Sequence, residues 1–162
     1  MVNSQMQAAS VEQGPVGIGG WLILPIIGLF LTPLQTVLQL GLYFELFEVL
    51  PHLDLAQQLV ALFEMVGTVI IYIILPLVLL LLIPNKKRSF PRLFVFWGIG
   101  NLLFLIVNLL ATYLVFREAF DAGGEPFFDR ETMRAIMSAV ILAAIWVPYM
   151  IQSRRVRNTF VN

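Results

Sequence analysis

The stretch MVGTVIIYIILPLVLLLLI, from Met65 to Ile83, contains no charged residue and decides the class of fold. Its length is close to the roughly 20 apolar residues that an α-helix needs to cross a hydrocarbon core of about 30 Å. The apolar segment around it begins at Gln57, and the chain contains three others of similar length. We therefore predict four transmembrane helices over residues 20–47, 57–83, 93–116 and 133–151, with a polar tail at 1–16 and a basic tail at 152–162.

The composition supports this interpretation. Of the 162 residues, 59% are hydrophobic and 12% are charged, whereas soluble domains are roughly 45–50% apolar. The chain has no cysteine and one histidine, so we expect no metal site, no thiol nucleophile and no cofactor. Because the net charge is zero and the basic residues are few, we also expect no nucleic-acid partner. The sequence predicts an all-α integral membrane protein whose four helices form one compact antiparallel bundle.

The charged residues orient this bundle. Seven of the ten Lys and Arg residues lie in the second loop or the C-terminal tail, namely Lys86, Lys87, Arg88, Arg92, Arg154, Arg155 and Arg157. By the positive-inside rule these two segments face the cytoplasm, and an even number of spans then places the N-terminus there too. We predict that both termini are cytoplasmic.

Local signals mark where two of the helices begin. Asp54 and Gln57 have the spacing of a capping box at the start of the second helix. Asp129, in EPFFDRE, is a candidate N-cap for the fourth helix. The first span lacks the basic n-region and small-residue cleavage site of a signal peptide, so we expect it to be a permanent span.

The first span follows a glycine cluster, GPVGIGG, from Gly14 to Gly20. A dinucleotide-binding loop would need a preceding strand and GxGxxG spacing, and this segment has neither. We expect either a tight entry turn packed under the basic second loop or a helix end that binds a lipid phosphate. The candidate headgroup contacts are Gly19, Gly20, Trp21, Lys86, Lys87, Arg88, Arg154 and Arg155.

Polar residues inside the spans recur at helical spacing. The candidates for a polar interior are Thr32, Gln35, Thr36 and Gln39 on the first helix, Thr68 and Tyr72 on the second, Asn101, Asn108 and Thr112 on the third, and Ser138 on the fourth. Because lipid offers them no hydrogen bonds, we expect these side chains to point inward. They then form interhelical hydrogen bonds, line a wet cavity, or lie at an interface between copies.

Glu64 is the single charged residue expected at hydrocarbon depth. We expect it to pair with Arg134 near the outer end of the fourth helix, or to reach the membrane interface. A proton or ion role is the functional alternative.

Three prolines, Pro25, Pro76 and Pro148, are predicted to fall in the cytoplasmic half of the membrane. Each lacks an N–H group and frees a carbonyl four residues earlier, so each can bend its helix. They either serve packing or open a cavity toward the cytoplasm. The tryptophans are expected to be interfacial anchors: Trp21, Trp97 and Trp146.

Three segments carry a family resemblance: GIGGWLILP from Gly17, SFPRLF from Ser89 and IWVPYMIQSRRVRNTFV from Ile145. They resemble the corresponding segments of the bacterial "domain of unknown function 2569" family. The resemblance covers nearly the whole chain and implies a small multi-pass protein of the bacterial inner membrane. The family brings no established activity and no catalytic residues.

The sequence therefore favours a non-enzymatic membrane module that binds or stabilises a membrane protein partner or a lipid. The alternative is a subunit of a small-solute or ion transporter or channel that acts as an oligomer. An enzyme is disfavoured because the chain lacks a credible nucleophile or metal set. The expected partners are the lipid bilayer and either another membrane protein or a second copy of the chain.

Overall fold

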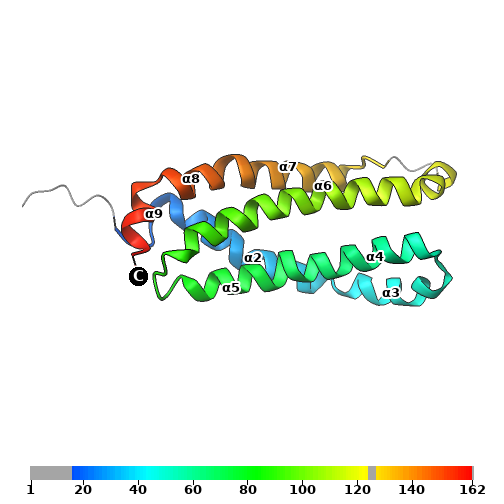
Figure 1. Ribbon diagram of the computed structural model, residues 1–162, viewed down its shortest axis with the longest axis horizontal. Helices are drawn as coiled ribbons and strands as arrows, with labels where there is room; N and C mark the ends of the chain where they lie inside the picture. The colour runs from blue at the N-terminus through cyan, green and yellow to red at the C-terminus, as the bar shows by residue number, and fades with distance from the viewer. Residues whose placement is uncertain (1–15, 124–126, 162) are drawn as a thin grey trace, which may run out of the picture.

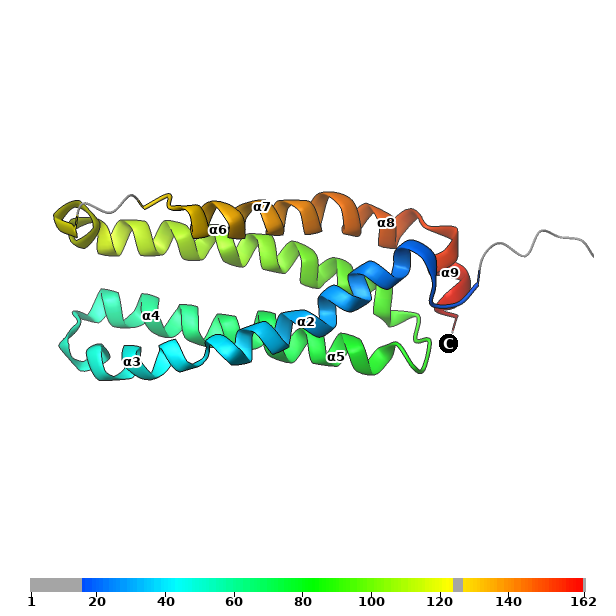
Figure 2. The same cartoon turned by 180° about the vertical axis from the view of Figure 1, so that it is seen from behind.

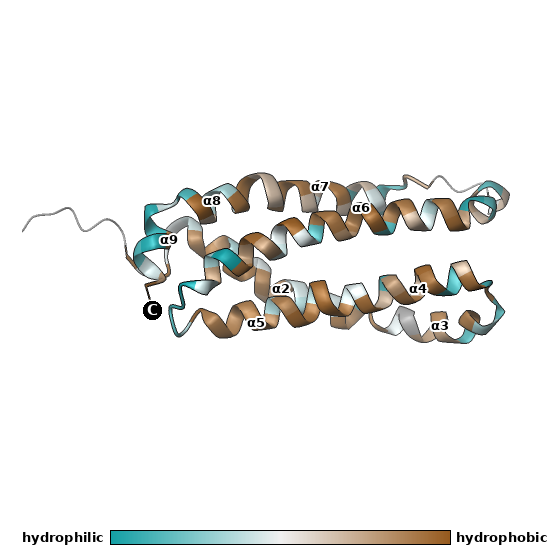
Figure 3. Ribbon diagram, viewed as in Figure 1, coloured by the Kyte–Doolittle hydropathy of each residue, from teal (hydrophilic) through white to brown (hydrophobic). Residues whose placement is uncertain are grey.

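The computed structural model describes residues 16–123 and 127–161. Its four long apolar helical segments are Gly20–Gln39, Leu55–Leu82, Ser89–Gly123 and Arg130–Gln152, each long and apolar enough to cross a membrane. They lie side by side and alternate in direction (Figure 1). Hydrophobic residues dominate their middle parts, and polar residues gather at the two ends of the bundle (Figure 3). The predicted all-helical fold with four candidate spans is confirmed.

The first segment is not one continuous helix. A 3₁₀ turn, η1 (Gly20–Leu22), leads into α2 (Ile23–Gln39), and the chain continues as α3 (Gly41–Val49) and η2 (Leu50–His52). Leu40 separates α2 from α3, because its N–H bonds the Val37 carbonyl three residues back at 3.2 Å. The neighbouring Gly41 also weakens the helix there. A single span over 20–47 was expected, and α2 instead crosses obliquely over α5 (Leu75–Leu82) (Figure 2).

The second segment begins with the predicted capping box. Asp54 Oδ1 accepts from the Gln57 N–H at 2.9 Å, and Gln57 Oε1 accepts from the Asp54 N–H at 3.2 Å. The segment consists of α4 (Leu55–Thr68), the π-helical turn η3 (Val69–Ile74) and α5. Pro76 is the second residue of α5. The π-helical turn therefore ends two residues before Pro76, which has no backbone N–H to donate.

The third and fourth segments run past the limits of their apolar residues. Helix α6 covers Ser89–Gly123, because the polar residues after the apolar part continue the helix and include an exposed Arg117–Asp121 pair at 3.7 Å. The fourth segment contains α7 (Arg130–Ile141), the π-helical turn η4 (Leu142–Trp146) and α8 (Val147–Gln152). The Asp129 carboxylate caps α7 as predicted, accepting from the Thr132 N–H at 2.7 Å. Ser153 then turns the chain into a short last helix, α9 (Arg154–Thr159).

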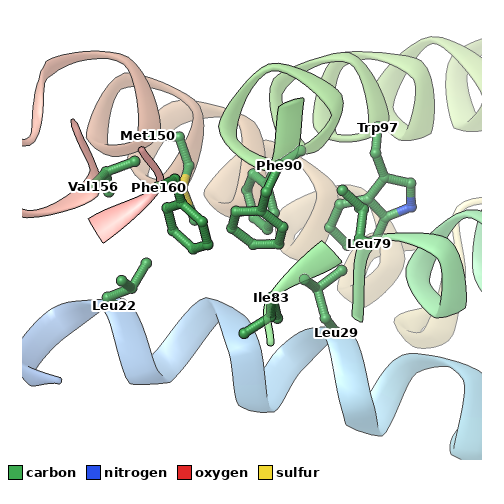
Figure 4. Close-up of a cluster of buried hydrophobic side chains, with 10 residues drawn as sticks. Leu22, Leu29, Leu79, Ile83, Phe90, Trp97, Met150, Val156 and Phe160 are labelled. Carbon is green, nitrogen blue, oxygen red and sulfur yellow. The ribbon is translucent and has the colours of Figure 1, made fainter. Parts of the chain in front are cut away.

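The hydrophobic core fills the half of the bundle that carries the two ends of the described chain (Figure 4). Phe160 stacks on Phe90 with ring centroids 4.4 Å apart, so the segment after α9 is part of this core. The buried cluster consists of Leu22, Leu29, Leu79, Ile83, Phe90, Phe94, Trp97, Met150, Val156 and Phe160.

One expectation about this half of the bundle is wrong. Trp97 is 4% exposed and lies in the core, where its indole bonds the Ile71 carbonyl, so it is not an interfacial anchor. Of the two alternatives for the prolines, the packed side chains of this half favour packing, although Pro148 is exposed. Pro25 lies in the first turn of α2, where a missing N–H costs little, and Pro25 and Pro76 are buried.

Candidate functional site

The opposite half of the bundle contains an open cavity of about 530 Å³ between α4, α6 and the beginning of α7. Sites for small molecules have volumes of about 300–1,000 Å³. Its wall combines acidic, amide, hydroxyl and aromatic side chains: Glu64, Asn108, Leu109, Thr112, Phe120, Phe127, Asp129 and Thr132. Because polar side chains of three candidate membrane spans line it, this cavity is the candidate functional site.

Glu64 lies on α4 and is half-buried. The Asn108 side chain on α6 hydrogen-bonds its carboxyl group. Because Asn108 Oδ1 has no partner, the amide N–H is the donor in this bond. An amide donor from the neighbouring helix thus holds the carboxylate at the cavity wall.

Of the two alternatives for Glu64, the ion pair with Arg134 is not formed. Thr132 faces the cavity, whereas Arg134, two residues further along α7, is exposed. Residues two positions apart point to nearly opposite sides of a helix, so Arg134 is turned away from Glu64. Within the described part of the chain no ion pair joins these two residues.

Polar atoms without partners mark one face of α6. Asn101 Oδ1, Asn108 Oδ1 and Thr112 Oγ1 are buried and have no hydrogen-bond partner among the described residues. Their spacing places all three on one side of the helix, with Asn101 two turns deeper than Asn108. A buried polar group left without a partner costs about 1–3 kcal/mol. This face is therefore suited to water or to a ligand that brings donors.

The polar stripe on α2 does not join this interior, contrary to expectation. Thr32 Oγ1 donates to the Gly28 carbonyl at 2.8 Å, and Thr36 Oγ1 donates to the Thr32 carbonyl at 2.9 Å. Because these hydroxyls bond their own helix, they need no partner on another. Gln35 and Gln39 are exposed on the outside of the chain.

The remaining interior candidates do not line the cavity either. Thr68 is half-buried, and Tyr72 packs edge-on against Phe104 with ring centroids 6.3 Å apart. Ser138 is exposed, which contradicts the expectation that it points inward. Of the ten interior candidates, the cavity brings together Asn108 and Thr112, and it adds Glu64 to them.

Sequence reasoning missed the aromatic wall and Thr132. Phe120 and Phe127 make an edge contact with centroids 5.2 Å apart, and Tyr113 lies 5.1 Å from Phe127. Phe120 and Phe127 flank the third loop, so only their spatial contact reveals the cluster. The sequence offered a partial signal for one member of the cluster, because the aromatic pair Phe127–Phe128 stands immediately before the predicted N-cap Asp129.

A second cavity of about 490 Å³ adjoins the first and shares Glu64, Thr112 and Phe120 with it. The residues that it adds are all apolar: Leu46, Ala61, Phe116, Ala119 and Gly123. The combined space has a polar part at Asn108 and Asp129 and an apolar part beside α3 and α4.

The glycine turn and the basic residues meet at the other end of the molecule. Thr159 Oγ1 accepts from the Gly17 N–H at 2.9 Å. The Arg155 guanidinium lies against Gly19 and Gly20, so a Cβ atom at Gly19 would be 2.9 Å from Nη1. The entry turn therefore packs on α9 and not under the second loop, because the chain reverses at Ser153 and brings α9 back over the turn.

The other predicted headgroup contacts surround this turn. Arg88 Nε donates to the Val161 carbonyl at 2.8 Å, which ties the second loop to the C-terminal segment. The remaining side chains are exposed: Trp21, Lys86, Lys87 and Arg154. Gly20 has φ +55°, a left-handed conformation that favours glycine. The basic groups thus gather at the end of the bundle that carries both ends of the described chain.

The four apolar helices define a polytopic α-helical membrane protein. The chain belongs to the family described as "Protein of unknown function (DUF2569)", which matches residues 15–161. A relative, "Inner membrane protein YdgK" of Escherichia coli (strain K12), is 27% identical over 154 residues, which cover 91% of this chain and 96% of the relative. No solved structure matches the chain. The family resemblance is confirmed, and the protein is a multi-pass protein of the inner membrane.

Proposed function

We propose that this protein is a non-enzymatic membrane module that binds a ligand, a lipid or a polar group of a partner protein in the Glu64 cavity. The observation that carries the proposal is the wall of this cavity, where a carboxylate adjoins two buried oxygen atoms without partners. Such a wall binds and orients a ligand. It supplies no nucleophile paired with a base, which acyl or group transfer would need.

The proposed orientation places both termini in the cytoplasm, so the cavity lies in the periplasmic half of the bilayer. Seven of the ten Lys and Arg residues lie at the end that carries both ends of the described chain. Every described acidic residue lies in the other half of the bundle. The positive-inside rule supports this arrangement. The packed core then separates the cavity from the cytoplasm.

A cavity-filling substitution tests the proposed site. Thr112→Phe places a ring in both cavities, whereas Leu110→Phe, on the same helix, places one on the exposed surface. Native mass spectrometry of each purified protein measures the species that remain bound. We expect a species bound to the wild type and to Leu110→Phe that is lost from Thr112→Phe. Equal retention by both variants, or no bound species on the wild type, would contradict the proposed site.

A transporter or channel subunit is the second candidate, and the position of Asn101 favours it. Asn101 is 6% exposed and continues the unpartnered face of α6 beyond the cavity toward the core. A path along this face would need the core to open or a second copy to complete it. Solute or proton flux into liposomes that falls in Glu64→Gln and in Asn101→Leu would support this candidate, and flux unchanged in both variants would count against it.

A further inference from the structure

We propose that the Glu64 cavity binds an organic ammonium cation that carries an apolar tail. This inference rests on the proposed function, because it names the class of ligand for the same cavity. It draws on four features of the site: its charges, its unpartnered oxygen atoms, its aromatic wall and its adjoining apolar space.

The charges that face the cavity are negative. Glu64 and Asp129 both line it. The basic residues of this end are Arg117, Arg130 and Arg134, which are exposed. Among the described residues, no Lys or Arg lines either cavity. A cation in the cavity would therefore meet the half-buried Glu64 carboxylate, where water screens less than in bulk solvent, and the exposed Asp129 carboxylate, without a competing positive side chain.

The oxygen atoms of the wall match the donors of an ammonium group. Asn108 uses its amide N–H toward Glu64, which leaves Asn108 Oδ1 as an acceptor. Thr112 Oγ1, one turn along α6, is likewise without a partner. An ammonium group has donors and no acceptor. A carbonyl ligand could accept from the Thr112 hydroxyl but would leave Asn108 Oδ1 unpaired, and an anion would also face the carboxylates.

The size and the aromatic residues favour an organic cation over a bare metal ion. A volume of about 530 Å³ far exceeds that of a single ion. Within the described residues, no group of three His, Cys, Asp or Glu side chains could hold a metal. Phe120 and Phe127 line the cavity, and the faces of such rings attract ammonium groups.

The adjoining space would hold the apolar tail. The second cavity begins at the shared residues Glu64, Thr112 and Phe120 and continues along Leu46, Ala61 and Phe116. A ligand whose head lies at Glu64 can extend its chain into this space. Two sources offer this chemistry, namely an amine-headed lipid of the bilayer and a soluble amphiphilic cation.

Calorimetric titration with hexylammonium, a primary ammonium cation that keeps its three N–H donors, tests the inference. The full chain is held in dodecyl maltoside micelles, which contain no amine, and empty micelles give the background heat. We expect saturable binding that weakens at least tenfold in Glu64→Gln and changes less than twofold in Glu118→Gln. Glu118 is exposed on α6 and makes a matched control for the loss of one carboxylate. Uncharged hexanol is expected to bind at least tenfold more weakly than the cation.

Lipid competition then identifies the source. If phosphatidylethanolamine weakens binding of the probe and phosphatidylglycerol does not, the natural occupant is a bilayer lipid with an amine headgroup. Binding that neither lipid weakens supports a soluble cation. If Glu64→Gln does not fold, Phe120→Leu replaces it, and we expect this variant to lose affinity for the cation and not for hexanol.

Equal affinity of the wild type and Glu64→Gln for the probe, or equal affinity for hexanol and the cation, would overturn the ammonium assignment. Native mass spectrometry of Thr112→Phe and Leu110→Phe, described above, distinguishes a wrong ligand class from a wrong site. A bound species that still depends on the cavity would mean that only the ligand class is wrong.

Discussion

The indole Nε1 of Trp97 donates a 2.7 Å hydrogen bond to the main-chain carbonyl of Ile71 on a neighbouring helix. The π-helical register explains why this carbonyl needs an outside donor. The Leu75 N–H bonds the Ile70 carbonyl, five residues back. With the same offset, the Ile71 carbonyl would need the N–H of residue 76, which is proline. The buried indole therefore supplies the donor that Pro76 lacks.

Removing this donor should destabilise the fold. Trp97→Phe keeps an aromatic ring in the core and leaves the Ile71 carbonyl unpaired, which costs about 1–3 kcal/mol. Denaturant unfolding in detergent measures this loss. In a Pro76→Ala background the restored N–H can bond that carbonyl, so we expect Trp97→Phe to cost less there. Equal losses in the two backgrounds would show that the hydrogen bond is not the cause.

Gly67 on α4 allows a close helix contact. A Cβ atom at this position would collide with Cε2 and Cζ of Phe104 on α6. We expect Gly67→Ala to destabilise the protein by about 1–3 kcal/mol, because the ring must leave its position. Gly100→Ala is the control, since a Cβ atom there meets nothing within 4 Å and alanine favours the helix by about 1 kcal/mol. Thermal unfolding that ranks Gly67→Ala as the more stable variant would contradict the contact.

These two contacts also show how far the sequence could predict the structure. The four spans and the caps at Asp54 and Asp129 follow from local patterns, because hydrophobic length and capping depend on residues near one another in the chain. The inward orientation predicted for the polar stripe on α2 was wrong for Gln35 and Gln39, which are exposed. The cavity depends on contacts between helices, such as Glu64 with Asn108, which no local spacing specifies.

Thr159 should hold the entry turn of the first span. It is 1% exposed, and its Oγ1 accepts from the Gly17 N–H and donates to the Arg155 carbonyl at 2.7 Å. Thr159→Val keeps the shape and leaves the Gly17 N–H unpaired, at a cost of about 1–3 kcal/mol. We expect faster hydrogen exchange at residues 17–20. Asn158→Ala, an exposed change on the same helix, serves as the control, and equal exchange in the two variants would contradict this role.

Acid should weaken the beginning of α7. Hydrogen bonds from Thr132 hold the pKa of the Asp129 carboxyl below its usual 3.8. The backbone N–H has the largest effect, and the side chain has the next largest. A lowered pKa means that the carboxylate stabilises the folded state above pH 3.8 and that this contribution fades as the pH falls through the folded pKa. The protection factors for hydrogen exchange at residues 130–134, taken relative to the intrinsic rate at each pH, should therefore fall at low pH. Asp129→Asn retains a cap without this titration, so an identical acid response in that variant would contradict the assignment.

Single cysteines can establish the orientation, because the chain contains none of its own. Phe128, before α7, and Asn158, on α9, are exposed at opposite ends of the bundle. If the basic end faces the cytoplasm, a membrane-impermeant maleimide added to intact cells will label Phe128→Cys and spare Asn158→Cys until the membrane is opened. A periplasm-active reporter fused after Asn162 will then be silent. The reverse labelling pattern would place the Glu64 cavity on the cytoplasmic side, where it would meet a different pool of ligands.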